Sequence, residues 1–171
     1  MLLEQESKLY CCLERNEIDI EDCFGVNKKD IGRILKEIKD DGIMADFTIL
    51  SIAPVLTWLL NRCSDSQSDI YAAGIIDCTN YNDESKNYIF CAAYYLGESF
   101  VRASDSLLWD TNTNYYTNSR LFPIVIGFRN YFKMYPLNEI HYISNMLQSR
   151  QIESLEQKIN ELLCLWLVKI R

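Results

Sequence analysis

The chain has 171 residues, of which 49% are hydrophobic and 24% are charged, a balance typical of a globular domain rather than of a disordered chain. This length suits one domain, which we expect to span residues 1–171. The formal net charge of -7 excludes broad, sequence-independent binding to DNA or RNA, which needs a basic surface over the phosphates. The same charge favours a partner protein with a basic surface, although acidic charge also serves solubility alone.

The first predicted elements are two helices joined by an acidic connection. Residues 2–15 form the first helix and residues 16–22 the connection. The second helix follows Asn27, a favourable N-cap, with Asp30 three residues later as in a capping box, and it ends at Gly42. An apolar stripe predicts that this helix is amphipathic. The stripe consists of Ile31, Ile34, Leu35 and Ile38.

The next segment, residues 47–62, allows two readings at its start. Ser51 is a suitable N-cap for a helix that takes up the rest of the segment, with Pro54 in the first turn. Residues 47–52 are then a short strand or an additional turn. A further helix is predicted over residues 69–80 after a polar loop.

The most apolar segment of the chain is residues 84–103, which are hydrophobic on nearly every side. Such a helix is predicted to be buried at the centre of the fold. A small β-hairpin is predicted around residues 107–128. Its strands are residues 107–109 and 123–128, and its loop is rich in Asn and Thr.

Two helices are predicted to complete the chain, over residues 137–148 and 151–169. The last has an apolar residue at heptad-like spacing for only two heptads, which favours core packing over a coiled coil. The fold class expected from this order is mainly α, a single helical domain with a small β-hairpin around residues 107–128.

The cysteines and the start of the chain predict a cytoplasmic protein. The seven cysteines form no Cys-x-x-Cys pair and no regular framework, so all are expected to be thiols in a reducing compartment. Met1 leads directly into Leu2 and Leu3 without a basic region, so no signal peptide is expected. No apolar run approaches the ~20 residues of a membrane span, and no membrane association is expected.

The sequence carries no recognisable catalytic or metal-binding motif. His141 is the single histidine, so a multi-histidine metal site is excluded, and its apolar neighbours favour a buried structural role. We expect no catalytic residues, no metal ligands and no cofactor. Residues 28–43 and 51–62 could imitate a helix-turn-helix, but the second helix is too apolar to read a DNA groove. A transcriptional regulator and an enzyme without a recognisable motif remain the alternative functions.

An ordered set of residues between positions 94 and 136 resembles a known pattern. It comprises Tyr95-Leu96-Gly97-Glu98, Phe100-Val101-Arg102, Leu108-Trp109, Pro123-Ile124-Val125-Ile126-Gly127-Phe128 and Pro136. This set is similar to a pattern of small bacterial proteins, some of which resemble immunity proteins of polymorphic-toxin and contact-dependent inhibition systems. The resemblance covers about a quarter of the chain and marks no active site.

The residues of this pattern have a structural interpretation of their own. Gly97 permits close packing of the long helix against a neighbour, and Glu98 and Arg102 have the i,i+4 spacing of an exposed ion pair. Trp109 and Phe128 are predicted to bury large aromatic area where the strands meet the helices.

The expected function is that of a cytosolic immunity protein that binds and neutralises a bacterial toxin domain, a nuclease with a basic surface. Two segments are candidate partner-binding sites. The first is the acidic connection, with Glu14, Glu17, Asp19, Glu21 and Asp22, which must be exposed between two amphipathic helices. The second is the hairpin loop, with Asp110, Asn112, Asn114, Tyr115 and Tyr116, because tyrosine on a loop supplies contact area at small entropic cost. A solvated turn and an ordinary surface loop are the equally open alternatives, and the sequence leaves the oligomeric state and the identity of the toxin undecided.

Overall fold

A computed structural model describes residues 27–63, 83–110 and 123–170. Its α-helices are α3 (Lys28–Asp40), α4 (Ile49–Arg62), α5 (Asp83–Ala103), α6 (Pro136–Gln148) and α7 (Leu155–Leu167). A short 3₁₀ helix, η2 (Arg129–Tyr131), follows two strands, β1 (Leu108–Asp110) and β2 (Ile124–Ile126). The prediction of a mainly α fold with a small hairpin is confirmed. The helices predicted for residues 2–15 and 69–80 lie outside the described residues.

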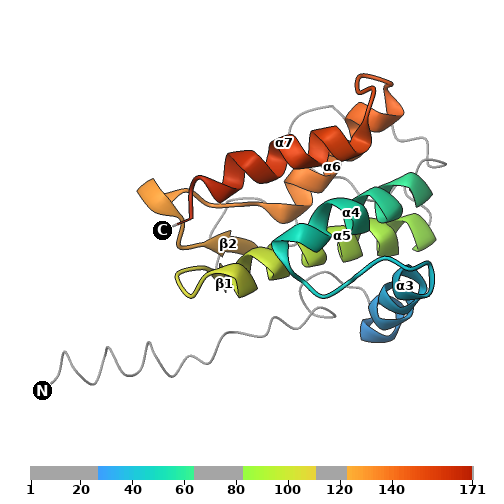
Figure 1. The fold of residues 1–171 in the computed structure, drawn as a ribbon, viewed down its shortest axis with the longest axis horizontal. Coiled ribbons are helices and arrows are strands. Elements are labelled where there is room, and N and C mark those ends of the chain that lie inside the picture. The colour runs from blue at the N-terminus through green and yellow to red at the C-terminus, as the bar shows by residue number, and fades with distance from the viewer. Residues whose placement is uncertain (1–26, 64–82, 111–122, 171) are drawn as a thin grey trace, which may run out of the picture.

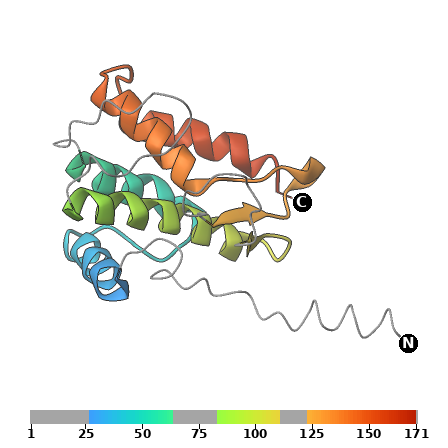
Figure 2. The ribbon, with the colours of Figure 1, turned by 180° about the vertical axis from the view of Figure 1, so that it is seen from behind.

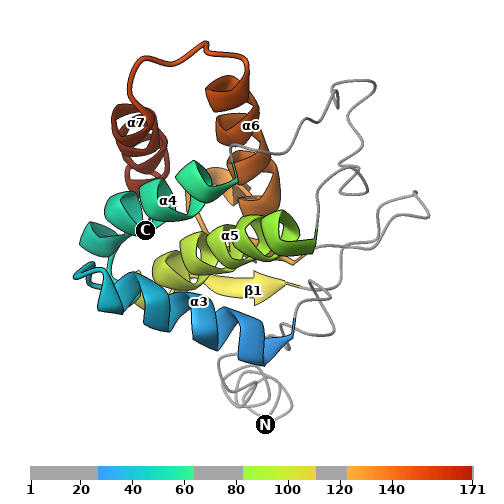
Figure 3. The ribbon, with the colours of Figure 1, turned by 90° about the vertical axis from the view of Figure 1, so that its right-hand side faces the viewer.

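The helices form three layers, and the pair of α4 and α5 is the middle layer (Figure 1). The helices α6 and α7 cover one side of this pair, and α3 covers the other (Figure 3). The hairpin packs against the C-terminal part of α5, at the same end of the molecule as the end of α7 (Figure 2). A single cluster of buried apolar side chains runs through all three layers, so every described helix is held by the same core.

Local sequence signals account for both ends of α3. The Asn27 side chain accepts a hydrogen bond from the Lys29 N–H at 2.8 Å, rather than from the Asp30 N–H as in the predicted capping box. At the other end the Ile43 N–H donates to the Ile38 carbonyl at 3.1 Å, and the Gly42 N–H donates to the Lys39 carbonyl at 3.0 Å. With Gly42 at a φ of 80°, this is the paired-bond C-terminal cap that favours glycine.

The helix α4 begins earlier than predicted, because its N-cap is Thr48 and not Ser51. Pro54 therefore lies inside the helix rather than in its first turn, where it has no N–H to donate to the carbonyl four residues earlier. Residues 49–52 are helical, so the short strand considered for residues 47–52 is wrong over that part. Most of α4 is buried in the core, which leaves the helix-turn-helix imitation without an exposed second helix.

The helix α5 is the central helix predicted from its apolar character. It contacts α3, α4, α6 and both strands. Its fully buried side chains include Cys91, Tyr95 and Phe100. Among the described residues, no helix is both long and apolar enough to cross a membrane.

The strands of the hairpin differ from the prediction: β1 is shifted by one residue from the predicted 107–109, and β2 is shorter than the predicted 123–128. β1 and β2 pair antiparallel, with Trp109 opposite Val125 and Asp110 opposite Ile124. The chain then turns back after η2, and Val125 and Met134 exchange two backbone hydrogen bonds of 2.9 Å. A third segment therefore extends the small sheet by one bridge.

The helix α7 begins after the predicted residue 151. Its N-cap is Ser154, whose hydroxyl accepts a hydrogen bond from the Gln157 N–H at 3.2 Å. The preceding turn contains Arg150 at a φ of 55°, a left-handed conformation that ends the helical path from α6. Trp166 and Leu162 on α7 then face the core.

The single histidine is buried on α6, with 8% of its surface exposed. Burial lowers the pKa of His141 from an ordinary 6.5 to about 4. The unfolded chain therefore takes up this proton first as the pH falls from about 6.5 to 4. We expect this window to remove roughly 3 kcal/mol of folding stability through His141.

The measurement is the free energy of unfolding by denaturant at a series of pH values for the native chain and for His141→Gln. The difference between the two should shrink as the pH falls through this window, while the titration of Glu139, whose pKa burial raises, is common to both proteins. Parallel pH profiles for the two proteins would contradict the buried neutral state of His141.

Burial also separates the reactivities of the described cysteines, Cys63, Cys91 and Cys164, which are free thiols. Burial raises the pKa of Cys63 and of Cys91 to about 12, whereas Cys164 is exposed on α7. Because the thiolate is the reactive form, we expect iodoacetamide to label Cys164 in the native protein and the other two only after unfolding. Peptide mass spectrometry checks this order, and native labelling of Cys91 at the rate of Cys164 would refute it.

Candidate functional site

The residues of the recognised pattern meet at a carboxylate between α5 and the hairpin. The Glu98 side chain accepts a hydrogen bond from Arg102 Nε at 2.7 Å and another from Trp109 Nε1 at 3.0 Å. The first confirms the predicted i,i+4 pair. The second was not predicted, and only 18% of the Glu98 side chain is exposed. The pair is therefore exposed on the Arg102 side, and the carboxylate has the additional role of holding β1 against α5.

Gly97 is the point of closest approach between α5 and the hairpin. A Cβ atom at Gly97 would lie 2.0 Å from Cη2 of Trp109 and 2.5 Å from its Cζ2. The indole lies directly over this glycine and is stacked on Tyr94, with ring centroids 6.5 Å apart and planes 7° apart. Trp109 is 3% exposed, so its predicted packing role and that of Gly97 are confirmed.

The other side of Arg102 and the tyrosines is covered by Phe47, from the connection before α4. Its ring stacks on Tyr95 with centroids 4.5 Å apart, and the Arg102 guanidinium carbon lies 4.3 Å from its centroid. The Phe47 N–H donates to the Tyr95 hydroxyl at 3.0 Å, and this hydroxyl is 2.7 Å from Ser51 Oγ. Phe47 has a φ of 60°, so tertiary contacts hold it in a strained conformation.

We call the cluster formed by these contacts the joint; it consists of Phe47, Tyr94, Tyr95, Gly97, Glu98, Arg102 and Trp109. The joint is a structural element and not a reactive centre. Its aromatic members are stacked on one another, and its carboxylate is already bonded to two donors. No local sequence pattern indicates this role of Phe47, because it lies 48 positions before Tyr95. In the described part of the chain, no three side chains of the metal-binding types gather where they could hold an ion.

The predicted partner-binding residues are placed only in part. The acidic connection with Glu14, Glu17, Asp19, Glu21 and Asp22 lies outside the described residues, as do Asn112, Asn114, Tyr115 and Tyr116 of the hairpin loop. Asp110 is described; it ends β1 opposite Ile124 and is half-buried.

A shallow cavity of about 360 Å³ opens between α4 and the start of α7. The Arg62 guanidinium carbon lies 3.3 Å from the Trp58 ring centroid. Asp41 accepts hydrogen bonds from Trp58 Nε1 at 2.7 Å and from Arg62 at 3.2 Å. Glu156 lines the opposite wall. Asp41, Trp58 and Arg62 satisfy one another, and the Thr57 hydroxyl, which also lines the cavity, is buried without a hydrogen-bond partner among the described residues. One hydroxyl does not make a set of convergent groups that would define a ligand.

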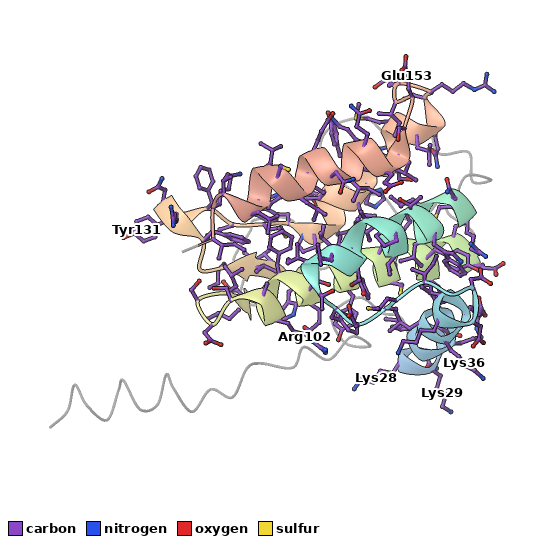
Figure 4. All side chains as sticks on the ribbon, viewed as in Figure 1. Lys28, Lys29, Lys36, Arg102, Tyr131 and Glu153 are labelled. Carbon is purple, nitrogen blue, oxygen red and sulfur yellow. The ribbon has the colours of Figure 1, made fainter. Side chains whose placement is uncertain are left out.

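Two adjacent aromatic side chains are exposed on the loop of residues 129–133, which we call the aromatic tip. All five residues, Arg129, Asn130, Tyr131, Phe132 and Lys133, are exposed. Tyr131 is 88% exposed and projects from one end of the molecule (Figure 4). This loop was not predicted from the sequence, although two aromatic residues flanked by basic residues, between a strand and a helix, were a usable signal.

The aromatic tip is fixed to the core on three sides. At its base are the paired hydrogen bonds between Val125 and Met134. Phe128 is fully buried, 4.9 Å from the Trp166 ring centroid. The Arg129 N–H donates to the Lys169 carbonyl at 2.7 Å. These attachments hold the backbone of the loop in place while its side chains are exposed.

The backbone of the tip is strained where its tyrosine stands. Asn130 has a φ of 54° and Tyr131 a φ of 59°, and a left-handed conformation costs about 1 kcal/mol or more for a bulky L-residue. Asparagine tolerates this conformation and tyrosine does not. The fold therefore carries an exposed ring at a position where another residue would be more stable, which is typical of functional surfaces.

Comparison with known proteins finds no family model, no curated protein and no solved structure that matches this chain. The resemblance of residues 94–136 to immunity proteins therefore stays a sequence-based hypothesis. Among the described residues, the aromatic tip is the candidate interaction surface.

Substitutions at the joint test its structural role. Trp109→Ala should lower the free energy of unfolding by roughly 3–5 kcal/mol, because it removes a buried aromatic ring. Glu98→Gln should cost about 1 kcal/mol, because a charge-assisted bond to the indole weakens. Glu37→Gln is the matched control, since it changes an i,i+4 pair with Arg33 that is exposed on both sides.

Denaturant unfolding measures all three variants, and the control should differ little from the native chain. If Trp109→Ala leaves stability unchanged and abolishes binding to a partner, the joint is a binding site and not a structural element.

Proposed function

We propose that the protein is an immunity protein, which acts by binding a bacterial toxin domain and neutralising it. The observation that carries this proposal is the aromatic tip, a rigidly attached loop that exposes Tyr131 and Phe132 to solvent. Aromatic side chains held in one conformation lose little entropy on binding and are enriched at protein interfaces. The resemblance of residues 94–136 to immunity proteins supports the same function from the sequence.

The partner that we propose is a nuclease toxin with a basic surface. The described residues hold 14 acidic and 13 basic side chains, so they are nearly neutral. Most of the net charge of -7 therefore belongs to the remaining segments, among them the acidic connection. An acidic segment complements the basic substrate cleft of a nuclease and speeds the encounter with it.

The direct test uses the product of the adjacent upstream gene, which this proposal expects to contain a nuclease toxin domain. The purified chain should form a stable complex with that domain and should suppress its cleavage of DNA or RNA at an equimolar ratio. Co-expression should also protect growing cells from the toxin. Unchanged cleavage in the presence of excess chain, with no complex on size-exclusion chromatography, would refute the proposed function.

The two sequence-predicted segments differ in the kinetic effect that we expect of them. Reversing the acidic residues of the connection to Lys should slow association with the toxin and remove most of its dependence on salt. These residues are Glu17, Asp19, Glu21 and Asp22. Replacing Tyr115 and Tyr116 by Ala should chiefly raise the dissociation rate, because buried anchors act there.

Stopped-flow or surface-based kinetics at low and high salt distinguish the two effects. Unaltered rates in both variants, with their folds intact, would place the interface on another part of the molecule.

A further inference from the structure

We propose that the aromatic tip is the anchor of the interface and that it docks on a protein surface where carboxylates surround an apolar pocket. This inference rests on the proposed function, because it names the chemistry of the surface that the protein would recognise. It concerns residues 129–133 together with the end of α7.

The shape of the tip suits a pocket rather than a flat surface. Tyr131 projects from one end of the described part of the molecule (Figure 4). The base of the loop is held by the bridge between Val125 and Met134, and its side by the bond from Arg129 to Lys169. A ring presented on a fixed base fills a partner's pocket without first having to be ordered.

Apolar side chains continue the surface from the tip onto α7. Phe132 is 44% exposed, and Lys169 Nζ lies 4.5 Å from its ring centroid and 4.0 Å from that of Trp166. Val168, the C-cap residue of α7, is 72% exposed. The apolar side chains next to a projecting tyrosine favour an interface with a buried apolar centre.

The ionisable side chains of the tip and of the chain after Cys164 are cations, whereas the nearby carboxylate of Glu139 accepts a hydrogen bond from Trp166 and is partly buried. Residues 129–133 and 165–170 contain the cations Arg129, Lys133 and Lys169 and no carboxylate. The complementary partner surface therefore carries carboxylates around the pocket that receives the ring. This charge is opposite to that of the acidic connection, so the two segments of one chain would engage different parts of a partner.

A protein fits this surface better than a nucleic acid or a membrane. Three cations are a small footprint for a polyanion, and the chain as a whole has a net charge of -7, which repels phosphates and anionic lipids at a distance. A local pocket with a few carboxylates is compatible with both the basic tip and the acidic remainder.

The test begins with a random peptide library displayed on phage and selected against the native protein. We expect enrichment of sequences that combine Asp or Glu with large apolar residues. A synthetic peptide from this selection should bind the native chain, as measured by fluorescence anisotropy. Tyr131→Asn should weaken this binding about tenfold or more, as expected for an anchor residue, while the melting midpoint stays the same or rises because asparagine tolerates the left-handed backbone.

Matched variants separate the tip from general effects of composition. Tyr142→Asn changes another exposed tyrosine, on α6, and should leave the affinity unchanged. The double substitution of Arg129 and Lys133 by Glu should weaken binding most at low salt. The same charge change at Lys29 and Lys36, on α3 at a distance from the tip (Figure 4), should have little effect.

Several outcomes would overturn the inference. Selection that enriches no acidic apolar peptides would do so, as would native affinity in Tyr131→Asn. Binding of a fluorescent single-stranded oligonucleotide or of phosphatidylserine vesicles that depends on Tyr131 would assign the tip to a nucleic acid or a membrane instead.

The toxin assay then distinguishes failure of this inference from failure of the proposed function. If the native chain binds no toxin while the tip still binds acidic apolar peptides, the immunity function fails and the docking chemistry stands. If Tyr131→Asn binds and neutralises the toxin as well as the native chain does, the tip is not the anchor and the immunity function stands.

Discussion

The contact between the Trp109 indole and Gly97 is the constraint on which the arrangement of the hairpin depends. The indole occupies the space where any Cβ at Gly97 would stand, and its N–H is held by Glu98. Since Glu98 also binds Arg102, a single carboxylate links the strand to two turns of α5. Large buried aromatic area and a charge-assisted bond act on the same side chain, which fixes the strand in position and in orientation.

This constraint determines where the chain can go after the hairpin. At Gly127 a Cβ would lie 1.8 Å from the Ser106 carbonyl oxygen, and the residue has a φ of 100°, so only glycine allows β2 to leave the sheet in this direction. Phe128 then enters the core beside Phe100 and Trp166. The exposed aromatic tip is thus the next segment of a path that buried groups dictate. The packing of the core therefore explains why this loop is exposed. It does not explain why a tyrosine occupies the strained position at residue 131.

The chain contains segments of opposite charge, which the net charge does not show. The described helices are nearly neutral, whereas the acidic connection concentrates negative charge in a short stretch of sequence. The tip and the end of α7 carry only positive charge. A protein with patches of opposite sign recognises a partner by the pattern of charge, and the net value mainly governs long-range encounter.

The sequence by itself determined what depends on neighbours along the chain. Periodicity identified α3 and α6, and an unbroken apolar stretch identified α5. Glycine and asparagine marked the ends of α3, and apolar runs separated by turn residues identified the hairpin, because these signals act within a few residues. Only the tertiary structure decided that Ser51 bonds to Tyr95 instead of capping α4, that Glu98 holds Trp109, and that residues 129–133 are displayed at one end. Each of these depends on groups brought together across turns and layers, and no local pattern encodes which distant side chain will supply the partner.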